Sequence, residues 1–390
     1  MNETNNISTI SLLNNYLLTA VNMGASDIHF EPDIDYLRVR FRVDGKLHEV
    51  GREDIKTHSQ IITRIKVLGQ IDIGDKKAII DGRFPIKIGG ENLDIRFSIF
   101  PTMYGESAVL RILLSSQIEL GLKHVGMNQS QLETFTKMIN KPYGLLLVTG
   151  PNGSGKTTTL YSALNQINSI DKSIVTLEDP IEYHLPLLRQ TQIDEERGVT
   201  FASGLRALLR QDPNVIMVGE IRDKETAKIA VQAAITGHLV FSSLHTNNSV
   251  GALIRLINME VEPFLIAYAV QGVVAQRLVR KICNQCKEAY LPSPEVQNAL
   301  GVKINREIYR GRGCSACQNT GYKGRVAIFE VMQITNEIRS VILQNKSVGF
   351  DKLTALAKQG GMQSLREHGL EKILAGETTP EEILLVTENY

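Results

Sequence analysis

One short run constrains this chain more than any other: a glycine-rich turn that ends in Gly-Lys-Thr. It comprises Gly150, Pro151, Asn152, Gly153, Ser154, Gly155, Lys156 and Thr157. The apolar residues LLLVT precede it, and the helical pattern TTTLYSALNQI overlaps its end and follows it. The spacing GxxxxGKT between a strand and a helix predicts a loop whose backbone N–H groups surround phosphate oxygens. Glycine lets the backbone turn around an anion without a Cβ in the way.

This loop predicts a nucleotide site. The N-terminus of the following helix adds a dipole that favours phosphate. Lys156 is expected to reach the β- and γ-phosphates, and the Thr157 hydroxyl is expected to ligate Mg²⁺. We therefore assign Gly150 through Thr158 as nucleotide-binding residues, with ATP and Mg²⁺ as the cofactors. A chance glycine-rich turn is the alternative, and the flanking strand and helix argue against it.

Hydrolysis needs more than binding: an acidic residue at the end of a neighbouring strand must hold a magnesium water or polarise the attacking water. Two apolar stretches end in such acids. VIMV is followed by Gly219 and Glu220, and IVTL is followed by Glu178 and Asp179. Because such strand ends line the ligand crevice of open α/β sheets, both acids are predicted to serve the nucleotide. A solvated turn acid is the alternative for either one alone.

Two histidines flank another apolar stretch, HLVFSSLH. His238 and His245 can be polar strand ends, or sensors of the nucleotide state that bond phosphate or a catalytic carboxylate. The spacing leaves both interpretations open.

Short apolar strands alternate with helical patterns from residue 142 to 390, which predicts an α/β domain with a largely parallel sheet. The expected strands are 145–149, 174–177, 215–218 and 239–243, and the expected helices include 156–167, 201–209 and 224–235. Residues 1–116 predict a smaller α+β domain with an Asp-Gly hairpin at Asp44 and Gly45. Residues 117–141 are interpreted as a linker and a helix.

Four cysteines form two C-x₂-C pairs, Cys283 with Cys286 and Cys314 with Cys317, in an insertion over 283–317. Four thiolates in this pattern predict a structural Zn²⁺ site. Such a site has no open coordination position, so the ion is expected to stabilise the insertion rather than to catalyse. Two reduced thiol pairs without metal are the alternative.

Charge and hydropathy narrow the function classes. The chain has 43 Lys and Arg against 42 Asp and Glu, so no field for a polyanion covers the whole protein and no nucleic acid is expected as a partner. The N-terminus lacks the pattern of a signal peptide, and no apolar stretch reaches the length of a membrane span. We expect a cytoplasmic protein.

The motifs form a recognisable set. GPNGSGKTTTLY, TLEDPIEY, LLRQDPNVIMVGEIRD and TGHLVFSSLHTNN follow one another, and SDIHFEP and RFSIFPTMYGESAVLRIL lie upstream. From about Leu12 to Tyr390 the sequence resembles the ATPases of type II secretion and type IV pilus assembly, the GspE/PilB family. The resemblance implies a homohexameric motor with a RecA-like C-terminal domain, preceded by a PAS-like domain. It also implies that the motor moves an inner-membrane platform protein, together with other secretion or pilus components, and lies peripherally at the inner membrane through these partners.

The same resemblance assigns roles to single residues. Glu178 matches the water-activating glutamate, and Glu220 matches the strand-end acid near magnesium. His238 and His245 match a histidine box.

Five arginines are also candidates for contact with the nucleotide or for sensing its state. The resemblance implies that Arg96 and Arg111 reach the nucleotide from the upstream domain, where a guanidinium can stabilise charge on the γ-phosphate. Arg206, Arg210 and Arg222 lie near the strand-end acids in sequence and are weighed as nucleotide sensors. Ordinary salt bridging is the alternative for all five, and the sequence leaves open which arginine acts across a subunit boundary.

Two features indicate which members of this family the chain resembles. Assembly-type members commonly carry a four-cysteine zinc element that retraction-type members generally lack, which favours extrusion of a fibre. Typical members also carry a further N-terminal domain that binds the platform partner and, in some, a cyclic dinucleotide. That domain is expected to be absent here, so no cyclic dinucleotide site is predicted.

Two other function classes compete with the motor. A nucleotide-gated scaffold would bind ATP with negligible hydrolysis, and the strand-end acids argue against it. A DNA-translocating RecA-like motor would need a basic surface, and the near-zero net charge argues against that class.

Overall fold

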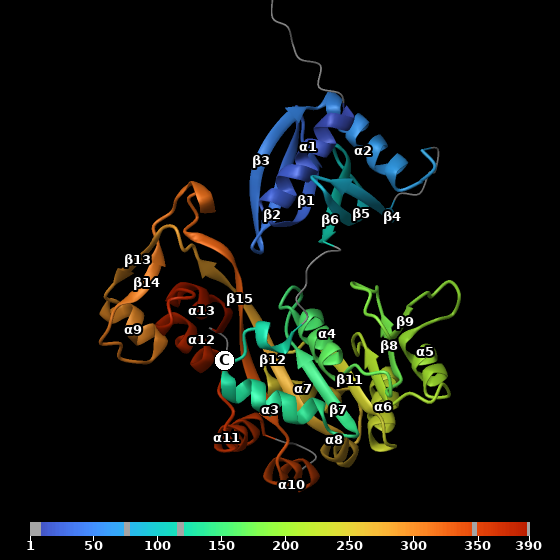
Figure 1. Ribbon diagram of the computed structural model, residues 1–390, viewed down its shortest axis with the longest axis vertical. Helices are drawn as coiled ribbons and strands as arrows, with labels where there is room; N and C mark the ends of the chain where they lie inside the picture. Colours follow the sequence, from blue (N-terminus) through green and yellow to red (C-terminus); the bar gives the residue numbers. More distant parts are fainter. Residues whose placement is uncertain (1–8, 74–78, 115–120, 345–348, 388–390) are drawn as a thin grey trace, which may run out of the picture. The chain divides into compact units, whose positions relative to one another are not determined.

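The computed structural model describes residues 9–73, 79–114, 121–344 and 349–387. The chain divides into two compact units, Met1–Ile118 and Glu119–Tyr390 (Figure 1). Each unit has its own hydrophobic core.

The N-terminal unit is one antiparallel sheet covered by two helices. Its elements in order are α1 (Thr9–Asn22), β1 (Ala25–Pro32), β2 (Tyr36–Val43), β3 (Lys46–Asp54), α2 (Lys56–Leu68), β4 (Ile80–Ile88), β5 (Glu91–Thr102) and β6 (Gly105–Leu114). The strands are ordered β3-β2-β1-β6-β5-β4. Apolar side chains alternate along the strands and pack against α1 and α2, whereas the other face of the sheet is polar.

The predicted Asp-Gly hairpin joins β2 to β3. Asp44 and Gly45 both have positive φ, 49° and 84°, as a two-residue turn with the twist of its strands requires. The turn leaves Val43 opposite Lys46.

The C-terminal unit is built on a seven-stranded sheet ordered β15-β12-β7-β11-β10-β8-β9. Its strands are β7 (Gly144–Thr149), β8 (Ile174–Glu178), β9 (Arg189–Gln192), β10 (Val215–Val218), β11 (Leu239–Leu244), β12 (Val270–Ile282) and β15 (Tyr322–Gln333). All neighbours in this sheet run parallel except β15, which is antiparallel to β12. The four strands expected from the sequence are present.

Helices cover both faces of this sheet, which is why its central strands β7, β10 and β11 are buried on both sides. Leu146 and Val148 pack toward the face with α3 (Gln129–Ile139) and α4 (Lys156–Ile167). Leu145 and Leu147 pack toward the opposite face. That face carries α5 (Phe201–Leu208), α6 (Lys224–Ile235), α7 (Ser249–Asn258), α8 (Pro263–Ala269), α10 (Asn336–Gln344) and α11 (Phe350–Gln359).

The long strands β12 and β15 were not among the expected strands. They form an antiparallel ribbon, and the cysteine insertion connects their ends (Figure 1). The insertion contains β13 (Lys287–Tyr290), α9 (Pro294–Leu300), β14 (Ile308–Gly311) and a short turn, η2 (Ser315–Cys317). α12 (Leu365–Leu374) and α13 (Pro380–Thr387) pack beside the ribbon with α9. A further short turn, η1 (Leu122–His124), precedes α3.

Among the helices that the structure describes, none combines the length and the apolar character that a membrane crossing needs.

Backbones approach closely inside the insertion. A Cβ added at Gly311 would lie 1.9 Å from the carbonyl oxygen of Gly321. Neither backbone can move without disturbing the cysteine turns, since Cys283 N–H donates to the same Gly321 oxygen at 3.0 Å.

We therefore expect Gly311→Ala to destabilise the protein by about 1–3 kcal/mol, the usual cost of overpacking. Gly349→Ala is the control because its added methyl meets open space at an ordinary φ of −66°. Thermal unfolding of both variants measures the difference. Equal midpoints for Gly311→Ala and the parent protein would contradict the close approach.

Candidate nucleotide site and cysteine cluster

The glycine-rich loop lies at the carboxyl edge of the parallel strands, between β7 and α4. Gly153 and Gly155 have φ of 74° and 87°, a region that other residues rarely adopt. A Cβ on Gly155 would lie 2.7 Å from Nε2 of Gln276, and one on Gly150 would lie 2.5 Å from the Gln276 carbonyl oxygen. The glycines are required by the positive φ angles and by the strand packed behind the loop.

Lys156 begins α4, and its ammonium folds back on the loop. Nζ donates to the carbonyl oxygens of Gly150 at 2.8 Å and Pro151 at 3.1 Å. Burial lowers the pKa of Lys156, Glu220 opposes that shift, and Arg277 adds to it. Thr157 is exposed and Thr158 half-buried in the first helical turn. The Lys156 ammonium thus lies on the loop, where phosphate oxygens would compete with the two carbonyl oxygens for its hydrogen bonds.

Glu220 follows β10 and is held by two donors. His245 Nε2 donates to one carboxylate oxygen at 2.9 Å, and Arg222 donates to the other at 2.6 Å. Burial raises the pKa of Glu220, but these two hydrogen bonds outweigh it and keep the pKa below its usual value. Arg222 also lies 3.4 Å from a carboxylate oxygen of Asp179. The side chain of Glu220 is 19% exposed, so it stays ionised and accessible.

Glu178 ends β8 and differs sharply from Glu220. It is 3% exposed. Tyr161 of α4 donates to one oxygen, while Thr176 at 2.5 Å and Gln190 at 3.1 Å donate to the other. Burial and the hydrogen bond to Glu178 raise the pKa of Tyr161 far above its usual value, so Tyr161 stays a donor. Both oxygens of Glu178 are therefore engaged by protein groups.

The two histidines lie at opposite edges of the sheet. His245 follows β11 at the carboxyl edge and reaches Glu220. His238 precedes the same strand, where its ring bonds the Ala233 carbonyl at 3.0 Å. The strand between them spans about 20 Å at the usual rise per residue. The structure thus brings His245, and not His238, to the phosphate loop of its own chain.

The three C-terminal arginine candidates also separate. Arg222 belongs to the Glu220 group, as described above. Arg206 pairs with Glu225 at the start of α6, and Arg210 donates to the Arg206 carbonyl at 2.9 Å from beyond the end of α5. Both side chains are exposed, and their described contacts are ordinary surface contacts.

Three polar residues beside this site were not among those predicted from the sequence. Tyr161 holds Glu178, and Gln276 and Arg277 of β12 back the phosphate loop. Thr159 donates to Gln276 at 2.8 Å, and Arg277 is 5% exposed. The signal that could have revealed the last two is the polar pair inside the apolar run VVAQRLV.

Arg96 and Arg111 of the N-terminal unit are direct neighbours on adjacent strands. The pairing continues in one row across five strands, Arg42, Asp27, Arg111, Arg96 and Arg83. Asp27 is 4% exposed and accepts from Arg111 at 2.9 Å. Like charges directly opposite one another destabilise a sheet. The row therefore places Arg96 directly beside two other arginines, Arg111 and Arg83.

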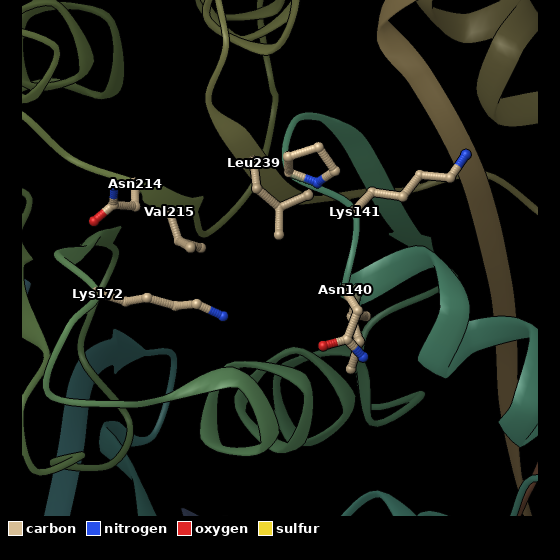
Figure 2. Close-up of a pocket in the computed structure, with 8 residues that line it drawn as sticks. Asn140, Lys141, Lys172, Asn214, Val215 and Leu239 are labelled. Atoms are coloured by element: carbon tan, nitrogen blue, oxygen red, sulfur yellow. The ribbon is translucent and has the colours of Figure 1, made fainter.

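A cavity of the C-terminal unit lies at the other edge of its sheet. It measures about 230 Å³, and Asn214, Val215 and Leu239 line it at the start of β10 and β11. Lys172 points into it, whereas Lys141 points away (Figure 2) and donates to Gln271 at 2.6 Å. The remaining lining residues are Ile139, Asn140 and Pro142. This cavity is separate from the phosphate loop.

The four cysteines meet in one cluster, with all Sγ atoms within 4.8 Å of one another. Three of the Sγ–Sγ distances are 3.9, 3.8 and 3.7 Å. Tetrahedral zinc with bonds of about 2.3 Å places its sulfurs about 3.8 Å apart. The cluster therefore has the dimensions of a four-thiolate zinc site.

Backbone donors prepare the cluster for thiolates. N–H groups of Cys314 and Gly321 donate to Cys317 Sγ at 3.2 and 3.3 Å. Burial alone would raise the pKa of Cys317, but these donors bring it down to about 6. Burial raises the pKa of Cys286 to about 11.

Comparison with known proteins identifies the family. The family described as Type II/IV secretion system protein matches residues 2–385. The chain belongs to this family. Type II secretion system protein E of Pseudomonas aeruginosa is 46% identical over 389 residues, which are 99% of this chain and 77% of that protein. The type IV pilus assembly ATPase PilB of Myxococcus xanthus is 44% identical over 96% of this chain and 67% of that protein.

Solved structures show the fold of this secretion-family chain. The pilus retraction motor PilT, solved with bound ADP, is 26% identical, with a TM-score of 0.66 over 96% of each chain. The ATPase DotB of Legionella pneumophila is 20% identical, with a TM-score of 0.73 over 100% of this chain and 98% of that chain, and shows the fold alone. The secretion-family chain therefore has an α/β ATPase fold, as the sequence motifs predicted.

Proposed function

We propose that this chain is an ATP-hydrolysing motor subunit of a type II secretion or type IV pilus assembly machine. One observation carries the proposal. The phosphate loop and the Glu220–His245–Arg222 group lie at the same carboxyl edge of one parallel sheet. Such an edge is where open α/β sheets bind their ligands. A phosphate loop for binding and an ionised, accessible carboxylate for turnover are the two parts that hydrolysis requires.

The nucleotide is ATP with Mg²⁺. Gly150 through Thr158 surround the phosphates, and Lys156 leaves its two carbonyl partners for the β- and γ-phosphates. Thr157, exposed in the first turn of α4, offers its hydroxyl to the metal ion. A bound magnesium ion would neutralise part of the phosphate charge.

The different burial of Glu178 and Glu220 decides which role each carboxylate can have in hydrolysis. The family resemblance predicts water activation by Glu178 and magnesium contact by Glu220. Glu178 is buried with both oxygens engaged, so water reaches it only if Tyr161, Thr176 or Gln190 withdraws. Glu220 is ionised and accessible. We therefore assign water polarisation to Glu220, along with contact to a magnesium water, and treat Glu178 as a carboxylate that holds this edge in shape.

Arg96 and Arg111 supply the transition-state cations from an N-terminal unit. Their neighbouring positions in a row with a single carboxylate support this role, because a guanidinium suits charge that builds on the γ-phosphate. Arrival of these arginines couples movement of the unit to hydrolysis. The strand order of the unit, with β1 beside β6 at its centre, supports a PAS-like assignment.

The working assembly is a homohexamer that acts on an inner-membrane platform protein, with the chain in the cytoplasm at the membrane surface. Its likeness to type II secretion protein E and to the assembly ATPase PilB supports this role. The cysteine cluster favours extrusion of a fibre over retraction. It holds Zn²⁺ through Cys283, Cys286, Cys314 and Cys317, and the ion stabilises the insertion because four protein ligands leave no position for substrate.

The catalytic assignment predicts different outcomes for two conservative variants. Glu220→Gln keeps the size of the side chain but loses its charge and one of its two acceptor oxygens, so ATP binding should survive while kcat falls about 100-fold or more. Glu178→Gln removes the charge from a buried acceptor and should lower stability while retaining more turnover than Glu220→Gln. Phosphate release and binding of a fluorescent nucleotide measure both effects.

The control is Glu133→Gln, at an exposed position of α3 where the carboxylate accepts from Gln129. Suppose that Glu178→Gln is fully stable but loses turnover, whereas Glu220→Gln stays active. That result would show that Glu178, and not Glu220, activates the water. Full turnover in both variants would show that neither carboxylate at this edge of the sheet is needed for ATP hydrolysis.

Zinc binding predicts a defined metal content. Purified protein should carry about one zinc per chain, and Cys317→Ser should carry almost none and unfold at a lower temperature. Ser315→Ala, in the same turn, is the matched control. Metal analysis and thermal unfolding give the result. Equal zinc content in Cys317→Ser and the parent protein would contradict the site.

A further inference from the structure

Residues 245–249 form a short segment that is anchored to five parts of the C-terminal unit in succession. His245 reaches Glu220 after β10, and Thr246 bonds Thr149 at the end of β7 through paired hydroxyls 2.7 Å apart. The Asn248 side chain accepts from Gly251 N–H and caps α7. The two other anchors come from the β12–β15 ribbon.

Arg277 of β12 is the first ribbon anchor. Its guanidinium donates to the Asn247 carbonyl at 2.7 Å and to the Gln276 carbonyl at 2.9 Å. The same Gln276 oxygen lies against Gly150 of the phosphate loop. Arg277 is 5% exposed, and both of these hydrogen bonds go to backbone carbonyl oxygens. One side chain thus bridges the 245–249 segment and the strand behind the phosphate loop.

Glu330 of β15 is the second ribbon anchor. One of its oxygens accepts from Ser249 N–H at 2.8 Å and from Ser249 Oγ at 2.5 Å. Glu330 is 6% exposed and lies opposite Ala275, which itself pairs with Thr149. The carboxylate therefore meets the N-terminus of α7 in the same row as the end of β7, where the helix dipole favours it.

We propose that Arg277 is a positioning residue for ATP hydrolysis, and that Glu330 assists it from the neighbouring strand. Together they hold residues 245–249 so that His245 stays on Glu220. This inference rests on the proposed role of the Glu220–His245 group. It adds that turnover depends on two residues of the ribbon that carries the cysteine cluster and that neither acts on the nucleotide directly.

A residue that acts through His245 has a kinetic signature. Arg277→Met removes both hydrogen bonds at similar length, and we expect kcat to fall about 10-fold while KM for ATP changes by less than about threefold. Arg277→Lys keeps the charge but not the planar guanidinium that donates both hydrogen bonds, so its kcat should lie between those of the parent protein and Arg277→Met. Arg255→Met, at an exposed position of α7, is the control and should stay within about twofold of the parent.

A double-mutant cycle separates positioning from general damage. On a His245→Asn background, Arg277→Met should lower kcat by no more than about twofold, because the group that it positions is already lost. Glu330→Ala should behave as Arg277→Met does in the same cycle. If Arg277→Met fails to fold in thermal unfolding, the cycle is run with Arg277→Lys.

Three outcomes would overturn the inference. Additive losses in kcat would show that Arg277 acts independently of His245. A raised KM with unchanged kcat would make Arg277 a binding cation instead. If His245→Asn itself leaves kcat unchanged, the proposed Glu220–His245 group fails as well, and the failure lies in that assignment rather than in the anchors.

Discussion

The packing of β12 behind the phosphate loop is the contact on which the site depends. Gln276 lies so close to Gly150 and Gly155 that neither position has room for a Cβ. Thr159 of α4 bonds the same side chain, so strand, loop and helix are held at one point. The conformation that phosphate binding needs is thus stabilised before any nucleotide arrives, which lowers the entropy lost on binding.

The same strand extends to the cysteine cluster. β12 ends at Ile282, one residue before Cys283, and β15 returns from the insertion to bring Glu330 beside α7. A partly buried ion pair between Arg280 and Glu382, with side-chain contacts of 2.6 and 3.0 Å, holds α13 to the ribbon near that end, and the Arg280 N–H also donates to Glu382 at 2.9 Å. The nucleotide edge and the metal-binding insertion therefore share one pair of strands.

Sequence reasoning succeeded where local pattern decides structure. The phosphate loop, the strand-end acids and the paired cysteines are each readable from spacing, and the short apolar strands were found because helices cover both of their faces. It failed where tertiary contacts decide. His238 and His245 look alike in sequence, yet parallel β11 carries them to opposite edges. The burial of Glu178 depends on Tyr161, Thr176 and Gln190, which no spacing links to it. The strands β12 and β15 pair across an insertion, so the local sequence of neither strand indicates that the other is its partner.

The central claim is that this chain hydrolyses ATP and that arginines from an N-terminal unit complete the site. The most direct test measures phosphate release with Mg²⁺-ATP over a series of protein concentrations, with sizing in parallel, for the parent protein and for Arg111→Ala. The account predicts that activity per subunit rises as hexamers form and that Arg111→Ala assembles but stays nearly inactive. A hexamer that binds ATP without releasing phosphate, or an Arg111→Ala hexamer with full activity, would contradict it.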